Sequence, residues 1–545
     1  MASAERNWGF ALAAGALLVA LQLRCGADAE DAAPAARVSS GGGFAQDASG
    51  SGVGGAAGAA GGAPIDAAPP EKELESAYRA PIATGRYVWT ANPDSGKVAL
   101  IDATTLDVRL TDAGFGPTYL AAVPEPGNAD ANAAIVLNVR GHDATLLRVA
   151  ADGALTTKSF PTHTDANAWA ISPGGKWAAA WSNADLVAQP DPTDGFQELT
   201  LIGLGSGAEN STRLSVGYRP SALFFDAAET RLFVVSEPGI SVIALDGAAP
   251  NVVGLVEVTD DPLDAPASRD VTITRDGKLA LVRRDGSPDV GFVPLDGGAR
   301  SVRTLSGPVT DLDLSDDGRR AVAVVRERSE LFLLEIPAAQ TDPAAVSVAA
   351  VPGEVFGSVS LSPDASAALL FTNAIPSDRL TIVHLAPGPD YLEHRTVAVK
   401  SPVRAVFAAP DARHALVLQE PAANGTKAGA FSVVSIAAEI APKIVATDAP
   451  AEAVALSPAP GSDRAIVTIR DERTRVFGAY LVRMPSLQVD LMKLASPPLA
   501  TGIVGTARQG FVAQKHPEGR ITFVDLESGS ARTLTGFELG AKVVD

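Results

Sequence analysis

Residues 312–324 read LDLSDDGRRAVAV, and this stretch decides the fold. It begins with alternating apolar and acidic residues, passes through a Ser-Asp-Asp-Gly turn and continues as an almost wholly apolar run, which is the pattern of a β-hairpin. Clear copies occur at 168–180 (AWAISPGGKWAAA), 271–282 (VTITRDGKLALV) and 359–370 (VSLSPDASAALL). Weaker copies occur at 224–226, 407–411, 454–458 and 503–509.

These copies lie about 41 to 54 residues apart, the spacing expected for a four-stranded propeller blade. A further apolar strand follows each hairpin, and a more polar fourth strand completes the unit. No such unit can bury both of its faces alone, so the units must stack side by side into a closed ring. We therefore expect an all-β fold, a single large β-propeller over residues 85–545. The count gives ten blades, and eight or nine remain alternatives because propellers usually have four to eight.

The two ends of the repeat region indicate how the ring would close. The first unit starts at Arg86 and lacks an innermost strand, whereas residues 539–545 (LGAKVVD) look like an innermost strand with no blade of its own. Joining them would complete one blade and hide two sheet edges. We expect the C-terminal strand to close the ring by joining the N-terminal blade.

A family resemblance rests on the first unit and on the hairpin turns. The run YVWTAN at 87–92, followed by SGKV at 95–98 and LID at 100–102, resembles the YVTN propeller repeat. The Ser-Pro-Asp and Ser-Asp-Asp-Gly hairpins resemble those of TolB-like and other WD40-type propellers. The resemblance implies a propeller fold, and it leaves function open because propellers host enzymes, sensors and scaffolds.

The N-terminus has the layout of an export signal. Arg6 precedes an apolar stretch over residues 8–23, and a small-residue A-x-A site ends at Ala29. Cys25, followed by Gly-Ala-Asp, resembles the lipidated cysteine of bacterial lipoproteins. We expect residues 1–29 to be a signal peptide, with three fates open: lipidation at Cys25, plain cleavage after Ala29, or an uncleaved anchor.

Residues 30–84 are rich in Ala, Gly, Ser and Pro, and such a segment buries too little apolar surface to offset its ordering entropy. We expect a disordered linker that tethers the propeller. The predicted location is outside the cytoplasm, in the periplasm, at the outer membrane or on the cell surface. Any membrane contact would come only through the N-terminal lipid or signal anchor.

Composition limits the partners. The chain carries a formal net charge of −19, which repels polyanions, so we expect no nucleic-acid binding. Cys25 is the only cysteine, and the repeat region therefore contains no disulfide. We expect a monomer.

No strong catalytic signature occurs in the sequence. It contains no G-x-S-x-G elbow, no H-E-x-x-H motif and no Walker A loop. The six histidines are scattered over different units, and we expect each to be a solvated loop residue or a satisfied surface residue. A calcium-like string from Asp313 to Gly318 has Val324 where a bidentate carboxylate is needed, so we interpret it as a hairpin. We expect no metal and no cofactor.

A polar residue follows the second strand of every unit. In propellers these positions lie on the face that also carries the blade-to-blade connections, so their side chains should surround one mouth of the ring. We predict a binding site for a polar or anionic ligand there. The alternative is that polar residues simply end strands and that the arginines pair with Asp285, Glu327, Asp471 and Glu472. The candidate binding residues are Asn92, Asn138, Asn183, Arg284, Arg326, Asn373, Arg470 and Lys515, and Glu237 and Gln419 complete the ring.

Three functional hypotheses remain. The first is a non-enzymatic, envelope-tethered binding platform for a protein, a carbohydrate or a small molecule. The second is a propeller enzyme, either a metal-assisted lactonase-like hydrolase or a quinone-dependent dehydrogenase. The third is a purely structural surface protein. Five tryptophans in the whole chain argue against stacking a large cofactor, so we favour the binding platform over an enzyme.

Overall fold

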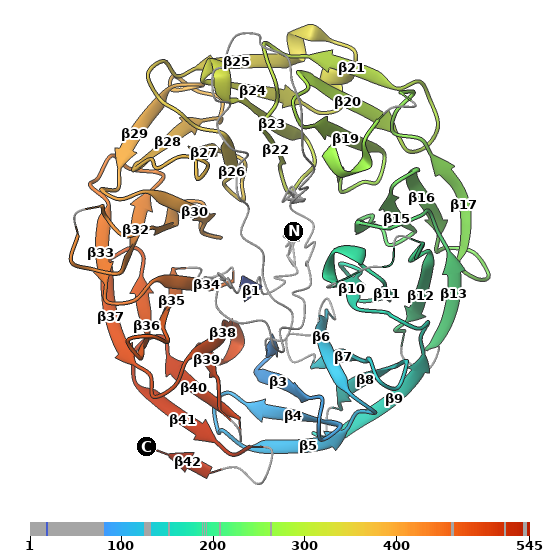
Figure 1. Ribbon diagram of the computed structural model, residues 1–545, viewed down its shortest axis with the longest axis vertical. Coiled ribbons are helices and arrows are strands. Elements are labelled where there is room, and N and C mark those ends of the chain that lie inside the picture. Colours follow the sequence, from blue (N-terminus) through green and yellow to red (C-terminus); the bar gives the residue numbers. More distant parts are fainter. Residues whose placement is uncertain are drawn as a thin grey trace, which may run out of the picture.

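The computed structural model describes residues 81–124, 132–150, 153–187, 193–205, 209–261, 264–423, 425–458, 463–516 and 519–537, with residues 189 and 191 and the backbone of 18–19 and 542–544. Within this part of the chain the strands form ten antiparallel sheets. Viewed end-on, the sheets follow one another around a ring (Figure 1). The fold is a ten-bladed, all-β propeller, as the repeat count predicts.

Each blade consists of four strands that run outward from the centre in chain order. The first five blades contain, in turn, β2 (Ile82–Thr84), β3 (Tyr87–Asn92), β4 (Lys97–Asp102) and β5 (Val108–Asp112); β6 (Pro117–Val123), β7 (Ala133–Asn138), β8 (Asp143–Val149) and β9 (Leu155–Pro161); β10 (Ala168–Ile171), β11 (Trp177–Trp181), β12 (Glu198–Gly203) and β13 (Asn210–Ser215); β14 (Ala222–Phe225), β15 (Arg231–Ser236), β16 (Gly239–Ala244) and β17 (Asn251–Val256); and β18 (Arg269–Ile273), β19 (Leu279–Arg284), β20 (Asp289–Pro294) and β21 (Ser301–Thr304).

Blades 6 to 10 follow the same plan. They contain β22 (Asp311–Leu314), β23 (Arg320–Val325), β24 (Glu330–Glu335) and β25 (Val346–Ala350); β26 (Ser358–Leu361), β27 (Ala367–Phe371), β28 (Arg379–His384) and β29 (His394–Ala398); β30 (Val403–Ala408), β31 (His414–Gln419), β32 (Gly429–Ser435) and β33 (Lys443–Thr447); β34 (Ala451–Leu456), β35 (Arg464–Asp471), β36 (Val476–Arg483) and β37 (Gln488–Lys493); and β38 (Pro498–Val504), β39 (Gln509–Gln514), β40 (Arg520–Asp525) and β41 (Ala531–Thr535).

Two short strands and six short helical turns complete these elements. β1 (Leu18–Val19) pairs with β34, and β42 (Lys542–Val544) pairs with β41. The helical turns are of the 3-10 type: η1 (Ala184–Leu186), η2 (Pro266–Ser268), η3 (Arg326–Arg328), η4 (Ala338–Gln340), η5 (Pro343–Ala345) and η6 (Gly505–Ala507). No helix in the described residues is long and apolar enough to span a bilayer.

The hairpin over 312–324 forms as its sequence predicts. The Ser315 hydroxyl donates to the Asp317 carboxylate at 2.7 Å and accepts from the backbone N–H of Arg320 at 3.0 Å. Gly318 completes the turn with a φ of +70°, a conformation that favours glycine. The calcium-like string is therefore a hairpin turn, held by its own hydrogen bonds.

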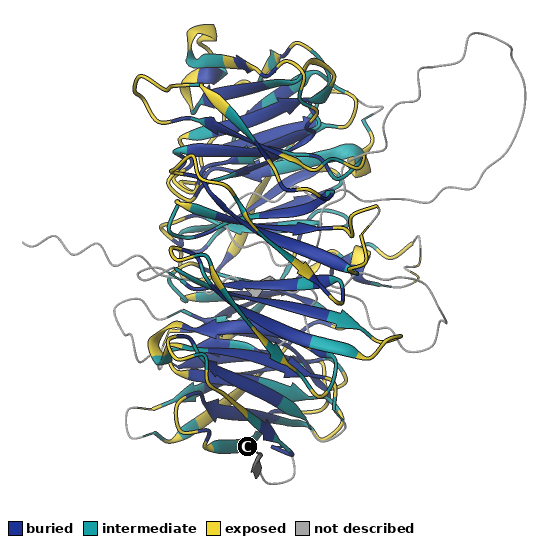
Figure 2. Ribbon diagram, turned by 90° about the vertical axis from the view of Figure 1, so that its left-hand side faces the viewer, coloured by how far each residue is buried: buried dark blue, intermediate teal, exposed yellow. Residues whose placement is uncertain are grey.

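The core lies between blades and not within any one of them. Successive residues of β23 point to opposite sides, so Ala321 and Ala323 pack toward blade 5 while Val322 and Val324 pack toward blade 7. All four are fully buried, which explains why the second strands are apolar without alternation. In side view the buried strands fill the middle of the disc, and exposed residues lie mainly in its loops (Figure 2).

Arginine side chains add polar links between neighbouring blades. Arg303 on β21 donates to the carbonyl of Ala339 in blade 6 at 2.8 Å. Arg395 on β29 reaches the carbonyl of Ser435 in blade 8 at 2.5 Å. Such charge-assisted bonds contribute about 1.5–3 kcal/mol each. The guanidinium groups of these arginines therefore bond to a neighbouring blade.

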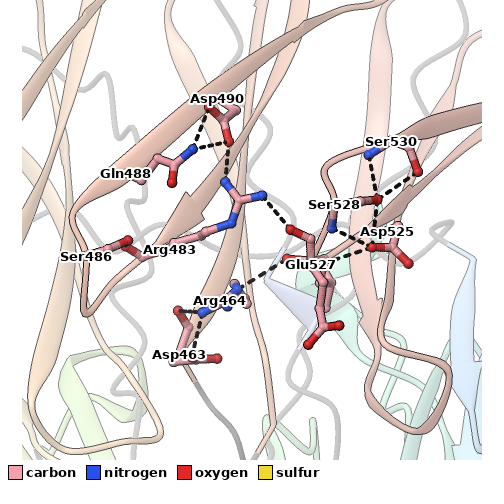
Figure 3. A network of polar contacts seen from close by, with 11 residues as sticks. Asp463, Arg464, Arg483, Ser486, Gln488, Asp490, Asp525, Glu527, Ser528 and Ser530 are labelled. Atoms are coloured by element: carbon pink, nitrogen blue, oxygen red, sulfur yellow. Dashed lines mark hydrogen bonds and ion pairs between the residues drawn. The ribbon is translucent and has the colours of Figure 1, made fainter.

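The same arrangement joins blades 9 and 10 (Figure 3). Arg483 pairs with Asp490 of its own blade and donates to the carbonyl of Glu527 in blade 10 at 2.9 Å. Arg464 donates to the carbonyl of Leu526 at 3.2 Å and pairs with Asp463. A carboxylate within blade 9 thus holds each guanidinium in position to reach the next blade.

The predicted ring closure is wrong. β2 is the innermost strand of blade 1, so that blade is complete without help, and the propeller starts at Ile82 and not at residue 85. The C-terminal strand β42 lies on the outer edge of blade 10. The ring closes by packing: Ala83 and Ile101 of blade 1 share a buried cluster with Phe511 of blade 10. β2 has only three residues, too few to show an alternating pattern.

The predicted signal peptide, the lipidation at Cys25 and almost all of the predicted linker lie outside the described residues. The backbone of 18–19 and the residues from 81 onward are the exceptions.

Candidate binding face

The second strand of each blade ends beside the start of its innermost strand, because the two strands are antiparallel. Asn138 pairs with Pro117, for example, and Arg284 pairs with Arg269. We call this end of the ring the mouth face: the first residues of the innermost strands, the last residues of the second strands, and the loops beside them. All ten predicted positions lie on it, at or within two residues of the end of β3, β7, β11, β15, β19, β23, β27, β31, β35 and β39.

The predicted asparagine side chains on this face form hydrogen bonds with backbone groups. Asn138 is fully buried and donates to the carbonyl of Ala113, in the connection from blade 1, at 2.7 Å. Asn183 accepts from the N–H of Asp185 at 2.9 Å and so caps η1. Asn373 donates to the carbonyl of Arg404 in blade 8 at 3.1 Å. Asn92 accepts from the N–H groups of Asp94 and Ser95 in its own turn.

The other predicted positions differ in exposure. Gln419 is buried and donates to the carbonyl of Val399 at 2.7 Å. Lys515 is exposed, and Arg326 begins η3. The backbone carbonyl of Glu237 accepts from Arg269 of blade 5 at 2.5 Å.

Two of the predicted arginines pair with acids: Arg470 pairs with Glu472, as the alternative interpretation expected, and Arg284 pairs with Asp264, which that interpretation did not name. Arg284 and Arg269 both contact Asp264, at 2.5 and 2.7 Å. Arg283, which is buried, lies 2.8 Å from Asp285. In blade 9, Arg470 pairs with Glu472 and also donates to the carbonyl of Pro498 in blade 10 at 3.3 Å. Acidic partners therefore neutralise several of the basic groups on the mouth face.

Two aspartates of β22 accept hydrogen bonds from the neighbouring blade. Asp311 and Asp313 accept from the N–H groups of Val359 and Leu361 on β26, at 2.7 and 2.8 Å. Burial raises the pKa of both carboxyls; the nearby Arg283 guanidinium opposes the shift at Asp311, and the Leu361 N–H opposes it at Asp313. These carboxylates satisfy the inner edge of β26, which has no further strand to pair with among the described residues of its sheet.

Four innermost strands carry a β-bulge at their second residue, and a bulge re-aims the side chain at that position. The bulged residues are Thr118, Arg404, Glu452 and Leu499. Arg404 donates to the carbonyl of Ala451 in the next blade. Burial raises the pKa of Glu452 to about 7, although the Arg470 and Arg404 guanidinium groups oppose the shift.

One histidine differs from its prediction. His163, in the connection between blades 2 and 3, is buried and lies between two hydroxyls: Nδ1 is 2.9 Å from Thr200 Oγ1 and Nε2 is 3.0 Å from Ser182 Oγ. Burial lowers the pKa of its imidazole to about 4, and the nearby Arg213 adds to the effect. His163 is thus a buried structural residue. Within the described residues, no three His, Cys, Asp or Glu side chains are placed to hold a metal ion.

A pocket of about 450 Å³ opens on the mouth face between blades 1 and 2. Its polar lining consists of Asp94, Thr118 and Arg140, with Arg140 Nη2 3.4 Å from Asp94 Oδ1. The apolar lining consists of Ala91, Pro93, Leu120 and Val139. This volume is in the range of small-molecule sites.

The pocket walls lie one or two residues beyond the positions that the repeat pattern predicts. The predicted residues Asn92 and Asn138 hold the two turns, while the residues that follow them, Pro93, Asp94, Val139 and Arg140, form the walls. The missed signal is that Asp94 and Arg140 occupy matching turns of adjacent units with opposite charges.

Comparison with known proteins gives only distant structural likenesses. No protein-family model matches the chain, and no curated protein sequence matches it either. Among solved structures, the dihydro-heme d1 dehydrogenase NirN is 13% identical with a TM-score of 0.41, over 73% of this chain and 71% of that one. A eukaryotic initiation factor is 11% identical with a TM-score of 0.46, over 73% and 96%. The β-propeller domain of Cps50 (Swd1) from Myceliophteria thermophila is 12% identical with a TM-score of 0.33, over 53% and 90%.

What the structure itself shows is a β-propeller of ten four-stranded blades.

Proposed function

We propose that this chain is an exported, envelope-tethered β-propeller whose mouth face is a binding platform. The observation that carries the proposal is the pocket between blades 1 and 2. Its ion pair is accessible, with Arg140 51% and Asp94 87% exposed, so both groups are available to a ligand. Elsewhere on the mouth, Asn138, Asp311 and Arg404 already bond to the backbone of a neighbouring blade or connection.

The same contacts favour binding over catalysis. Burial raises the pKa values of the Asp311 and Asp313 carboxyls, but each carboxyl already accepts a hydrogen bond from a backbone N–H of the next blade, and this bond opposes the shift. Their geometry is that of a link between blades. A binding platform needs blades that are held rigidly to one another, and these hydrogen bonds between blades 6 and 7 contribute to that rigidity.

A compound screen tests the platform. The protein carrying Cys25→Ala is incubated with soluble sugars, amino acids, nucleosides and short peptides, and its melting temperature is measured. A ligand at 100 times its Kd stabilises the folded state by about 2.7 kcal/mol, which is a measurable shift. We expect at least one class to raise the melting temperature, and Arg140→Ala to abolish the rise.

The matched control is Arg508→Ala. Arg508 also forms an exposed ion pair, 2.5 Å from Glu527, but it follows η6 at the end of the ring opposite the mouth. This variant should keep the shift. No shift with any class, or a shift indifferent to Arg140, would contradict the proposal.

Export and tethering are supported by the apolar segment over 8–23, Cys25 and the Ala/Gly/Ser/Pro-rich residues 30–84. Fractionation of cells expressing the full chain tests them. The native chain should pellet with membranes and be extracted by detergent, and Cys25→Ala should move to the soluble fraction. If Cys25→Ala still pellets with membranes, lipidation is wrong.

A further inference from the structure

An exposed aromatic side chain lies against Arg140, one of the residues that line the pocket. Phe115 lies in the connection between blades 1 and 2 and is 64% exposed, the largest exposed fraction among the described large apolar residues. It stands between Gly114, with a φ of +133°, and Gly116, with a φ of +75°. Both conformations favour glycine, and they set the course of the backbone on either side of Phe115.

The two glycines also bring this segment close to the end of β7 and the turn that follows it. A Cβ at Gly114 would lie 2.4 Å from Asn138 Nδ2, and one at Gly116 would lie 2.8 Å from Arg140 Cγ. Only glycine allows so close an approach. The Arg140 guanidinium consequently lies 5.8 Å from the centre of the Phe115 ring while it pairs with Asp94.

Phe115 does not line the pocket itself, but it adjoins the pocket through Arg140, which lines the pocket and lies over the ring. Phe115 offers an apolar face, Arg140 offers hydrogen-bond donors, and Asp94 offers acceptors. The pair carries no net charge, and the chain as a whole carries −19, so a strongly anionic ligand gains nothing here. A purely aromatic ligand would use Phe115 and leave the ion pair unused.

A neutral sugar ring uses all three groups. Its C–H face can lie on an aromatic ring, and its neighbouring hydroxyls both donate and accept, so they can bond to a carboxylate and a guanidinium at once. We propose that the pocket between blades 1 and 2 binds one ring of a neutral saccharide, with Phe115 as the stacking surface and Arg140 and Asp94 as the hydroxyl partners. This inference rests on the proposed binding platform and names its ligand class.

Saturation-transfer NMR on the Cys25→Ala chain tests the inference. The probes are glucose, galactose, N-acetylglucosamine and cellobiose, with glucuronate and p-cresol as anionic and aromatic comparators. We expect signal transfer to at least one neutral sugar, with weaker transfer to both comparators. Phe115→Ala should weaken sugar binding at least tenfold, and Phe115→Tyr should restore it.

The matched control is Tyr391→Ala, which removes another exposed aromatic side chain, 37% exposed, from blade 7. It should leave sugar binding unchanged. If no neutral sugar binds while the screen finds another Arg140-dependent ligand, the saccharide inference fails and the platform stands. If nothing binds at all, both fail. If a sugar binds equally well to Phe115→Ala, the assigned pocket is wrong.

Discussion

Asp311 on β22 accepts a hydrogen bond from the backbone N–H of Val359 on β26 at 2.7 Å, and so joins the innermost strands of two different blades. An innermost strand has a partner on one side only, and its remaining N–H groups need an acceptor. In a ring of ten blades, side chains of the neighbouring blade supply part of this need. Asp313 repeats the contact with Leu361 at 2.8 Å.

Removing this acceptor should loosen blades 6 and 7. We expect Asp311→Ala to leave the Val359 N–H unsatisfied and to lower the free energy of unfolding by about 1–3 kcal/mol. Asp311→Asn keeps an acceptor oxygen and should cost clearly less. Urea unfolding of the two variants measures the difference, and equal losses would show that the hydrogen bond is not what stabilises this boundary.

Because of His163, we expect the folded protein to lose stability on acidification. The pKa of its imidazole is about 4 in the folded protein and 6.5 ordinarily, so between these values the unfolded chain binds the proton and the folded chain does not. Stability contributed by the neutral ring is full above pH 6.5 and is lost as the pH falls toward 4. His163→Gln cannot bind that proton. Its melting temperature should fall less than that of the native chain between pH 7 and 4.5, and parallel curves would contradict the assignment.

We expect Glu452 to make the stability of the protein depend on pH in the opposite direction. The pKa of its carboxyl is about 7 in the folded protein and 4.5 ordinarily, so the folded chain binds the extra proton between these values. Its contribution is full below pH 4.5 and is lost as the pH rises through 7. Glu452→Gln resembles the protonated form, so it should melt higher than the native chain at pH 8. The advantage should disappear by pH 4.5, and a variant less stable at pH 8 would refute the prediction.

We expect copies of the protein to associate weakly through the outer edge of blade 4. β17 is an outermost strand without a charged residue, and Val253 and Leu255 on it are 59% and 48% exposed. The outer strands of the adjacent blades, β13 and β21, contain Arg213 and Arg303, and charges of this kind discourage edge-to-edge pairing. We expect Val253→Lys to reduce light scattering at high protein concentration without lowering the melting temperature. Unchanged scattering would remove β17 as the contact.

The repeat itself could be predicted because its signals are local. The Ser315–Asp317 turn and the apolar run after it lie within a dozen residues, and the same chemistry recurs in other blades. The ends of the second strands could be placed for the same reason. Asn92 and Asn138 lie at the ends of second strands, as the repeat pattern predicts, but their side chains hold turns. Asp94 and Arg140, which follow them, line the pocket.

The features that escaped prediction depend on contacts between blades. The bond from Val359 to Asp311 joins residues in two repeats, and no spacing within one repeat encodes it. The bulge that re-aims Glu452 depends on the register between β34 and β35. The three residues of β2 become recognisable as a strand only through pairing with β3.

Direct packing of blade 10 on blade 1 closes the ring, and chemical crosslinking across this boundary can test the contact. The Thr506 hydroxyl donates to the carbonyl of Gly85, next to Arg86, across this boundary. In a Cys25→Ala background, which removes the only native thiol, Arg86→Cys and Thr506→Cys are treated with a short bismaleimide and the linked peptides are identified by mass spectrometry.

The control pairs Thr506→Cys with Lys278→Cys, which occupies the corresponding hairpin of blade 5 and is exposed. We predict rapid crosslinking within one chain between positions 86 and 506, independent of protein concentration, and none between positions 278 and 506. Absence of the 86–506 link, with both thiols shown to be reactive, would contradict the closed ring.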